Sequence, residues 1–517
     1  MSLLSNLQEM ERTREAYWLQ FPKTSPVKLR WRALTVRHCF HLLPGESILE
    51  LGAGSGLWTE HLVRATSGEN PITAAVFHND LAAKLRSRQL SAVEVIDGAD
   101  LLAPMLSESF DYIVGTAILC HDLFAENLHA LYRLLKPGGQ ILFFEANYWN
   151  PQVFLKSIIP TLARWAGNAR CQVGMRKFQL MHVASHQGFT HVQVIPYDIV
   201  HGRTPRFLIN SIQDVAFILE HTPLLREFCG TLYMWARKPG QARRPAVSLA
   251  KHKALFGSTS IVVPCHNEEM NVGPLVAVLT QLYDPYIHEI LLVNDNSQDR
   301  TADAVRALSS EFPKVKLIDR KPPNGVGRAL RDGYAAASGG LILTMDCDFV
   351  HIVPEFRDLF DAIAEGHAGA IGSRFTHESV LINYPLPKIL VNRGFHLVLN
   401  LLLRLRVRDV SNNLKLMRSE IYKSLIIDED HFAANVETGL KPILAGYDIR
   451  EVPISWINRT VDMGRSSFRI LTVAPNYARA LARIIREAQS IRKSAAVITK
   501  DISKLRQADV NAPTLHE

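Results

Sequence analysis

Hydrophobic and polar positions alternate along this chain in two separate stretches, residues 28–239 and residues 258–470. Each stretch opens with a short apolar run, continues into a turn rich in glycine or polar residues, and then repeats apolar runs and helical patterns. Strands that alternate with helices usually pair in parallel and are covered by those helices. The pattern therefore predicts an α/β fold with two sheet-containing domains.

The remaining segments differ from these two stretches in composition. Residues 240–257 are basic, contain Pro and Gly and show no period, so we interpret them as a linker. We expect a helical extension over residues 1–27 and a basic amphipathic tail over residues 471–517. No internal repeat relates the two stretches, which predicts two different domains rather than a duplication.

Composition narrows the class of protein. Of the 517 residues 47% are hydrophobic and 21% are charged, which excludes a mainly disordered chain, a collagen-like chain and a polytopic membrane protein. The net charge is +8, and residues 469–517 carry nine Lys/Arg against four Asp/Glu. A basic excess confined to a tail favours contact with an anionic membrane or an acidic partner over nucleic-acid binding.

Cysteines and candidate targeting segments add little to this picture. The six cysteines show no CxxC or metal-ligand spacing, which predicts reduced, mostly buried thiols. The N-terminus does not resemble a signal peptide, and the longest near-apolar run, residues 395–403, is shorter than the roughly 20 residues that span a bilayer. We expect a cytoplasmic protein that is peripheral at the cytoplasmic face of a membrane.

The sharpest motif of the first stretch is SILELGAGSG, residues 47–56. Its apolar residues predict a buried strand, and its glycines predict a tight turn through which the backbone approaches a ligand at a helix N-terminus. A glycine turn alone is weak evidence, because several nucleotide-binding folds have one. Glu50 shifts the balance, since an acid before the turn repels pyrophosphate but can pair with a ligand ammonium group.

This motif resembles motif I of class I S-adenosylmethionine-dependent methyltransferases. The resemblance continues through FDYIV (110–114), LLKPGGQILFFE (134–145), and GFTHVQVIPY and TLYMWARKP, which are similar to the final antiparallel hairpin of that family. It implies a Rossmann-like sheet that binds S-adenosylmethionine (SAM) through Glu50, Gly52, Gly54 and Gly56.

One departure from the family concerns the acid that ends its second strand and binds the ribose. Here that region reads ITAAVFHND, so either Asp80 replaces the acid or Asn79 substitutes for it. Near the adenine the resemblance offers Asp97 or Asp100, with simple turn residues as the alternative. His121 is the candidate general base of methyl transfer, with a structural histidine as its alternative.

The second stretch places polar residues after successive predicted strands. PCHNE, VNDNSQDRT and NGVGRAL are followed by LILTMDCDFVH, which sets Asp346 and Asp348 directly after an apolar strand. Two carboxylates at i and i+2 can both reach one divalent cation. Hard oxygen ligands suit Mg²⁺ or Mn²⁺, and such an ion can clamp a diphosphate.

This series resembles family 2 glycosyltransferases of the GT-A fold, and most closely the dolichol-phosphate mannose synthase and polyprenyl-phosphate glycosyltransferase branch. The resemblance implies a metal-bound nucleotide sugar of the GDP-mannose or UDP-glucose type. Asn294 stands where the family has an acid, and Val350 stands where it often has a further polar ligand. The residues that the resemblance places around the nucleotide are Pro264, Asn267, Glu268, Asp295, Asp299, Gly325 and Gly327.

The same resemblance extends to an acceptor side. It implies functional roles for Arg374, Arg393, Glu437 and Arg459, within IGSRF, LVNRGFH and the block 434–459. Guanidinium groups match phosphate oxygens in bidentate fashion, so these arginines can bind a polyprenyl phosphate, which attacks without a strong base and inverts the anomeric centre. The alternative for each arginine is a structural ion pair.

Two stretches are candidates for membrane contact. NRGFHLVLNLLLRLRVRD (392–409) has an apolar body with basic ends, and the tail from Asn476 has apolar residues at helical spacing. The alternative is that either helix docks on the domain or on a partner. The oligomeric state is not indicated.

The leading hypothesis is a bifunctional enzyme. Its second domain transfers a hexose of the mannose or glucose type to a polyprenyl or dolichyl phosphate, and its first domain methylates a component of the same pathway. The alternative is transfer to a non-lipid glycan, with a catalytically inactive methyltransferase-like binding module. Nucleic-acid methylation has little support, because the first stretch shows no aromatic and basic platform.

Overall fold

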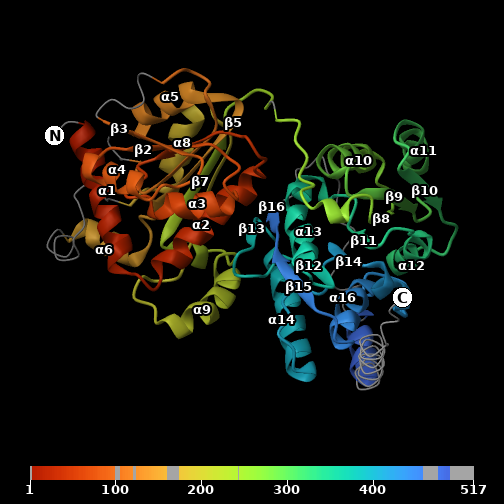
Figure 1. The fold of residues 1–517 in the computed structure, drawn as a ribbon. Helices are drawn as coiled ribbons and strands as arrows, with labels where there is room; N and C mark the ends of the chain where they lie inside the picture. The colour runs from red at the N-terminus through yellow and green to blue at the C-terminus, as the bar shows by residue number, and fades with distance from the viewer. Residues whose placement is uncertain are drawn as a thin grey trace, which may run out of the picture. The chain divides into compact units, whose positions relative to one another are not determined.

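The computed structural model describes residues 3–98, 105–119, 124–159, 174–242, 244–457 and 476–488. The chain forms two compact units (Figure 1). One comprises residues 1–247 with 383–389, and the other comprises residues 248–382 with 390–517. The division after Val247 falls within the segment expected to be a linker, and the expected domain bounds remain predictions.

The first unit contains a seven-stranded sheet with the order β3-β2-β1-β4-β5-β7-β6. Neighbouring strands from β3 to β5 pair in parallel, and β7 is antiparallel to both β5 and β6. The expected antiparallel pairing of the last two strands is therefore confirmed. The strands are β1 (Ile48–Leu51), β2 (Ile72–Val76), β3 (Val93–Asp97), β4 (Phe110–Thr116), β5 (Leu135–Ala146), β6 (Thr190–Tyr197) and β7 (Thr231–Arg237).

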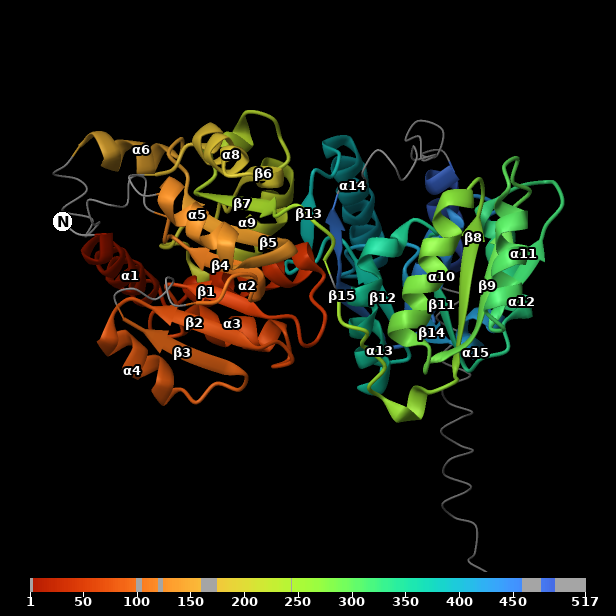
Figure 2. The same cartoon turned by 90° about the horizontal axis from the view of Figure 1, so that it is seen from above.

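Helices cover both faces of this sheet (Figures 1 and 2). On one face α2 packs against α3, and on the other α5 packs against α8. Leu128, Leu131 and Leu180 join the sheet residues Ile113 and Phe143 in the main hydrophobic core. The helices of the unit are α1 (Leu3–Gln20), α2 (Ser25–Phe40), α3 (Leu57–Ala65), α4 (Asn79–Ser87), α5 (Phe124–Leu134), α6 (Pro151–Ile158), α8 (Lys177–His186), α9 (Arg206–Leu219) and η2 (Leu225–Phe228).

The second unit contains a seven-stranded sheet with the order β10-β9-β8-β11-β14-β12-β15. Within it β14 is antiparallel to both β11 and β12, whereas the other neighbours pair in parallel. A small parallel sheet pairs β13 with β16. The strands are β8 (Thr259–Cys265), β9 (Ile287–Asn294), β10 (Val315–Asp319), β11 (Leu341–Thr344), β12 (Gly369–Ser373), β13 (Val380–Ile382), β14 (Lys415–Arg418), β15 (Ile449–Pro453) and β16 (Ser455–Ile457).

Helices pack against this second sheet as they do against the first (Figure 2). Ala329 and Leu330 of α12 lie in a core with Val262, Val293 and Ile342 from β8, β9 and β11. The helices of the unit are η3 (Lys253–Leu255), α10 (Glu269–Tyr283), α11 (Thr301–Glu311), α12 (Val326–Ala336), η4 (Phe349–Phe356), α13 (Arg357–Ala364), α14 (Leu386–Leu403), α15 (Ser419–Ser424) and α16 (Ala434–Leu444).

The described part of the C-terminal tail, residues 476–488, is helical and docks on the second unit. Leu481, Ile484 and Ala488 are buried in one cluster with residues of α14 and α16. Arg483 also pairs with Glu429 at 3.1 Å. The apolar side of this segment is therefore covered by protein, so the docking alternative holds for it and the expected lipid contact of these residues is corrected.

Candidate functional sites

The glycine motif of the first unit forms the predicted turn between β1 and α3. Gly52, Gly54 and Gly56 have φ angles of 64°, 60° and 83°. Residues with a Cβ rarely adopt this left-handed conformation, so the turn requires glycine at these positions. The turn lies at the carboxyl end of β1, beside the end of β4, which is where open α/β sheets bind their ligands.

Two carboxylic acids near this turn are wholly buried. Burial raises the pKa of Glu50 to about 7 and also raises the pKa of Glu145 to about 7. Glu145 Oε1 accepts hydrogen bonds from the Ile118 and Leu119 N–H groups, both at 3.1 Å. Glu50 Oε2 has no hydrogen-bond partner among the described residues. A buried oxygen of this kind fits the expected role of Glu50 opposite a cationic ligand group.

The acids expected near the ribose and adenine have other surroundings. Asp80 lies in the first turn of α4 with its side chain 83% exposed. Asp97 ends β3 and forms an ion pair with Arg86 at 2.5 Å. Ligand-binding roles for both acids remain predictions, and His121 and Asp100 lie outside the described residues.

A carboxylate that the sequence did not suggest lies where the second-strand acid is missing. Glu11 of α1 is fully buried and accepts a hydrogen bond from the Phe77 N–H at 3.0 Å, just after β2. Its position depends on tertiary contacts between residues 66 positions apart. Its only signal in the sequence is an acid on a helix that precedes the first strand.

In the second unit Asp346 and Asp348 directly follow β11, whose neighbours are β8 and β14. Asp348 is 9% exposed. Asn413, just before β14, donates through Nδ2 to Asp346 Oδ1 at 2.8 Å and thereby orients that carboxylate. Asn413 is a candidate site residue that the sequence did not indicate.

The two carboxylates fit a divalent cation in part. Among the described residues no group of three or more His, Cys, Asp and Glu side chains is placed to hold a metal ion. Two hard oxygen donors are nevertheless the ligand type that Mg²⁺ and Mn²⁺ prefer when substrate phosphates and water complete the coordination. Asp346 and Asp348 would therefore hold such an ion together with a diphosphate.

Residues expected around the nucleotide follow β8 and β9. Asp295 is buried, pairs with Arg320 and accepts a hydrogen bond from the Gly325 N–H at 2.7 Å. Asp299, two residues before α11, accepts from the Thr301 N–H at 3.0 Å, and it also accepts from the Glu269 N–H at 3.2 Å. These contacts make both acids part of the loop scaffold, and base recognition by them remains a prediction.

Pro264 lies near the end of β8, and Asn267 and Glu268 lie on the loop between β8 and α10. Asn267 has a φ of 59°, donates through its N–H to Ser297 Oγ at 3.0 Å and accepts from the Gln298 N–H at 2.8 Å. These bonds join the loop after β8 to the loop after β9. The structure thus brings two of the predicted motifs to one edge of the sheet.

Gly325 and Gly327 have a packing reason to be glycine. A Cβ on Gly325 would lie 2.3 Å from Asp430 O, and one on Gly327 would lie 2.0 Å from Glu429 O. The Gly327 N–H donates to Asp430 O at 2.8 Å. Close approach of the segment 429–430 therefore explains both glycines, and phosphate contact by them remains a prediction.

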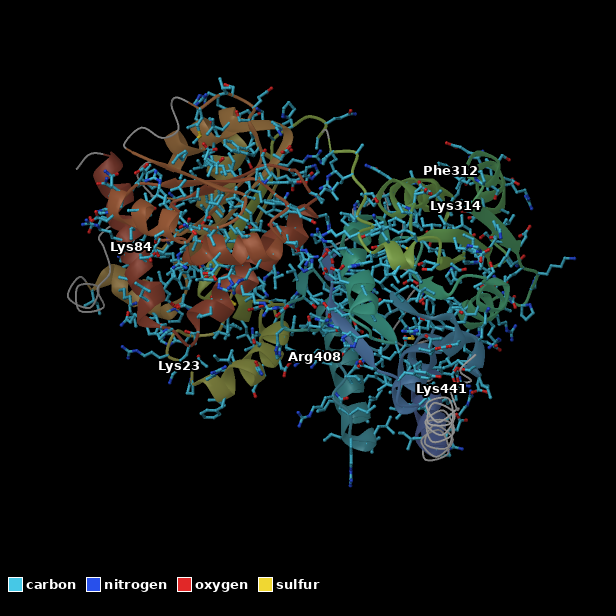
Figure 3. The ribbon with its side chains drawn as sticks, in the orientation of Figure 1. Lys23, Lys84, Phe312, Lys314, Arg408 and Lys441 are labelled. Atoms are coloured by element: carbon cyan, nitrogen blue, oxygen red, sulfur yellow. The ribbon has the colours of Figure 1, made fainter. Side chains whose placement is uncertain are left out.

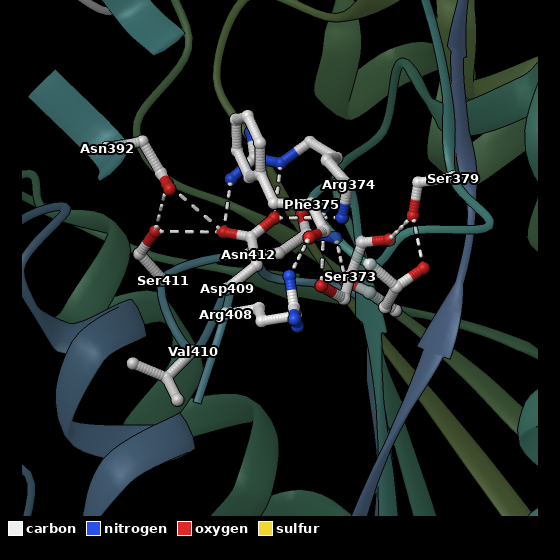
Figure 4. Close-up of polar contacts among 12 residues, drawn as sticks. Ser373, Arg374, Phe375, Ser379, Asn392, Arg408, Asp409, Val410, Ser411 and Asn412 are labelled. Carbon is white, nitrogen blue, oxygen red and sulfur yellow. Dashed lines mark hydrogen bonds and ion pairs between the residues drawn. The ribbon is translucent and has the colours of Figure 1, made fainter. Parts of the chain in front are cut away.

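Two of the acceptor-side arginines, Arg374 and Arg393, lie near Phe375, and Figure 4 shows Arg374 beside it. Arg374 and Arg393 hold their guanidinium carbons 5.8 and 5.6 Å from the centre of its ring. Arg374 also pairs with the buried Asp409 in bidentate fashion, with Nε–Oδ2 at 2.7 Å and Nη2–Oδ1 at 2.8 Å. Arg408, which the sequence did not suggest, donates through Nη1 to Phe375 O at 3.3 Å.

Asp409 is the anchor of this cluster. It is fully buried, and Arg374 holds its pKa down at about 2 in spite of that burial. Glu451 accepts the Asp409 N–H at 2.7 Å and so fixes the backbone there. The Arg374 ion pair is thus structural in part, which was the alternative for that arginine.

Glu437 has structural partners. Its Oε2 accepts from the Asp428 and Glu429 N–H groups at 2.9 and 2.8 Å, and Lys441, labelled in Figure 3, lies 3.0 Å from Oε1. These contacts hold the segment that packs on Gly327. A catalytic role for Glu437 remains a prediction, and Arg459 lies outside the described residues.

Helix α14 carries an apolar surface. By length and composition it could cross a membrane, and 22% of it is buried. Its inner side packs through Leu399 and Leu403 into the cluster with α16. Its exposed side bears large apolar side chains that range from 45% to 71% exposed, namely Leu390, Val391, Leu397, Val398, Leu401 and Leu402.

Comparison with known proteins finds one family match in each unit. Residues 48–139 match the model of a methyltransferase domain, and residues 260–426 match that of glycosyl transferase family 2. The chain is 29% identical over 185 residues to dolichol-phosphate mannosyltransferase of Pyrococcus furiosus, which covers 35% of this chain and 52% of that protein. It is 25% identical over 243 residues to polyprenol monophosphomannose synthase of Mycolicibacterium smegmatis. That match covers 45% of this chain and 87% of that protein.

The match thus spans about half the length of the Pyrococcus protein. Among solved structures, a SAM-dependent methyltransferase of Thermotoga maritima is 17% identical with a TM-score of 0.31, covering 44% of this chain and 98% of its own. Glucosyl-3-phosphoglycerate synthase of Mycobacterium tuberculosis is 19% identical with a TM-score of 0.35. That match covers 46% of this chain and 84% of the synthase.

Proposed function

Because the chain carries an N-terminal methyltransferase domain and a C-terminal family 2 glycosyltransferase domain, we propose that it is a bifunctional transferase. The second domain moves a hexose of the mannose or glucose type from a GDP- or UDP-sugar to a polyprenyl or dolichyl phosphate. The first domain binds SAM and methylates a component of the same glycan or lipid pathway. The observation that carries the glycosyl transfer is the carboxylate pair after β11, in which Asp348 is buried and Asn413 orients Asp346.

The donor side rests on Asp346 and Asp348. A divalent cation, when bound there, supplies positive charge against the leaving nucleotide diphosphate. Asn413 fixes one oxygen of Asp346, so the other oxygen keeps a defined direction. The linked loops after β8 and β9 form the edge against which the nucleotide lies.

The acceptor side rests on Arg374 and Arg393, which share Phe375. Asp409 holds the Arg374 guanidinium in a fixed plane, and a fixed guanidinium loses little entropy when it binds phosphate. The acceptor phosphate oxygen attacks the anomeric carbon as the nucleotide diphosphate leaves from the opposite side, which inverts that centre. The names of the two mannosyltransferase relatives support a lipid phosphate as acceptor.

The exposed apolar side of α14 supports peripheral contact with the membrane that holds such an acceptor. Six large exposed apolar side chains along one side of a helix are typical of an interaction surface. Replacing Leu397 and Leu401 by Glu is expected to reduce sedimentation with anionic vesicles that contain polyprenyl phosphate. Replacing Ile426 by Glu serves as the control, because Ile426 is 74% exposed and lies outside α14.

A donor screen tests the glycosyl transfer. Purified full-length protein is mixed with Mg²⁺ or Mn²⁺, a short polyprenyl phosphate, and GDP-mannose, UDP-glucose or UDP-N-acetylglucosamine in turn. The readouts are nucleotide diphosphate release and lipid-linked sugar by mass spectrometry. We expect one lipid product, reduced about 100-fold or more in Asp348→Ala. Asp303→Ala, which removes a carboxylate that is 71% exposed on α11, is the matched control.

Release of nucleotide diphosphate only to water, or product only on a free glycan, would contradict the lipid acceptor. For the first domain, titration calorimetry with SAM tests binding, and release of S-adenosylhomocysteine with extracted lipid-linked glycans tests catalysis. Binding without methyl release would identify an inactive binding module.

A further inference from the structure

Helix α1 inserts one side into the glycine turn of the first unit. Glu11, Arg14 and Glu15 lie on that side at the i, i+3 and i+4 spacing of helix neighbours, and they are 0%, 6% and 7% exposed. Arg12 and Leu19 lie on the outer side and are exposed. Three charged side chains are rarely buried together unless each one has partners.

Arg14 is placed as a cationic ligand group would be. Its Nη1 donates to Thr116 O at 2.7 Å, and its Nη2 donates to Gly52 O. These carbonyls lie at the carboxyl ends of β4 and β1, near the buried carboxyl group of Glu50. Acceptors that converge at the ends of two central strands favour a positive charge between them.

The two glutamates take the amide donors of the same turn. Glu11 accepts from the Gly54 N–H at 3.1 Å, and Glu15 accepts from the Ser55 N–H at 3.4 Å and from the Ser55 hydroxyl. Glycine-rich turns at helix N-termini offer such amides to negatively charged ligand groups. Here side chains of the protein itself bind them.

The α1 side chains also fill the room that the glycines leave. A Cβ on Gly54 would lie 2.8 Å from Glu15 Oε2, and a Cβ on Gly52 would lie 3.1 Å from Arg14 Nη1. At Gly54 the nearest atoms are therefore those of α1, whereas at Gly52 Ile118 lies nearer, at 2.7 Å, than Arg14 does.

We propose that α1 is an internal competitor for SAM. The Arg14 guanidinium binds the carbonyl groups that the ammonium group of an amino-acid-like cofactor requires. The Glu11 and Glu15 carboxylates bind the amide groups that the cofactor carboxylate requires. Helix α1 therefore leaves the turn before the cofactor enters. This inference rests on the proposed binding of SAM by the first domain. It makes methyl transfer conditional on release of α1.

The test compares variants that loosen α1 with matched variants on its outer side. In the full-length chain, Arg14→Ala removes the guanidinium from between the two carbonyls, and Arg12→Ala removes the same charge from an exposed position. Glu15→Gln and Glu9→Gln, the latter at a partly exposed glutamate of the same helix, form a second pair. SAM affinity is measured by titration calorimetry. Hydrogen exchange of peptides 3–20 and 48–57 is measured with and without SAM.

We expect Arg14→Ala to exchange faster over residues 3–20 and to bind SAM about tenfold more tightly than wild type, if about a tenth of the wild-type molecules have α1 released. Arg12→Ala matches wild type in both respects. In wild type, SAM speeds exchange over residues 3–20 and slows it over residues 48–57. Glu15→Gln changes affinity in the same direction as Arg14→Ala and by less.

Two outcomes overturn the inference, and they differ in what else they contradict. If wild type binds SAM while residues 3–20 become more protected, and Arg14→Ala binds more weakly, then α1 completes the site and only the inference fails. If neither wild type nor an Arg14→Ala variant with released α1 binds SAM, the proposed cofactor fails with it.

Discussion

Buried carboxylic acids near the two sites have pKa values that are shifted in opposite directions. In the first unit burial raises the pKa of Glu145 to about 7, and its hydrogen-bond partners are the amides of Ile118 and Leu119. In the second unit Asp409 is equally buried, but its pKa is lowered to about 2 because Arg374 pairs with it in bidentate fashion.

The difference shows that depth alone does not decide the charge of a buried acid. Desolvation disfavours the carboxylate in both places, and a guanidinium held at 2.7 and 2.8 Å outweighs it only in the second. In the first unit Arg14 of α1 binds carbonyl groups near the buried acids, whereas in the second Arg374 pairs directly with the buried Asp409.

Breaking the Arg374–Asp409 pair is expected to have the largest effect on the free energy of unfolding. Asp409→Asn leaves the largely covered Arg374 guanidinium, 14% exposed, without its counter-charge, so we expect the second domain to lose about 4 kcal/mol of unfolding free energy. Denaturant unfolding measures this loss. The control is Asp448→Asn, which removes an aspartate that is 74% exposed and pairs with His367. Equal losses in the two variants would contradict the central role given to Asp409.

The packing of α12 on the segment 429–430 gives the next effect. Gly327→Ala places a Cβ 2.0 Å from a backbone oxygen, so we expect a loss of about 3 kcal/mol. Gly273→Ala, in the interior of α10 with nothing within 4 Å of the added carbon, is expected to gain about 1 kcal/mol by helix propensity. If Gly327→Ala keeps stability and loses only donor affinity, the glycine serves the nucleotide instead.

The raised pKa of Glu145 predicts a pH dependence for the first domain. The folded state keeps this proton up to about pH 7, whereas an unfolded chain releases it near 4.3. Stability from this group is therefore full below the unfolded pKa and is lost as pH rises towards 7. Glu145→Gln keeps the acceptor oxygen, so we expect it to exceed wild type by about 2 kcal/mol at pH 8 and to match it near pH 4.5.

Thermal unfolding of both proteins from pH 4.5 to 8 measures this difference. Glu108→Gln, which replaces a glutamate that is 53% exposed beside Lys238, is the control and is expected to run parallel to wild type. A constant offset between Glu145→Gln and wild type across the range would show that the carboxyl group is not titrating there.

The smallest effect is expected at the edge of the first sheet. Asp97→Asn breaks a partly exposed pair with Arg86, so it is expected to cost less than about 1 kcal/mol of stability. If Asp97 serves only this pair, SAM affinity stays unchanged in titration calorimetry. A fall of tenfold or more would restore the adenine-binding role that the family resemblance implies.

Two α/β domains and the order of their motifs could be predicted from the sequence alone. The apolar runs before Glu50 and Asp346, and the glycine or carboxylate residues after them, are local signals because a buried strand and a tight turn each depend on neighbouring residues. The carboxylate pair after β11 and the glycine turn after β1 are therefore where they were expected.

Which charged groups meet depends on tertiary packing. Arg14 reaches a carbonyl 102 positions away, and Arg374 reaches Asp409 35 positions away. The pairing of such groups depends on how helices and strands pack, which hydrophobic periodicity does not specify. The same reason explains why Glu11, Arg408 and Asn413 were not anticipated as site residues, and why the tail helix 476–488 lies on protein.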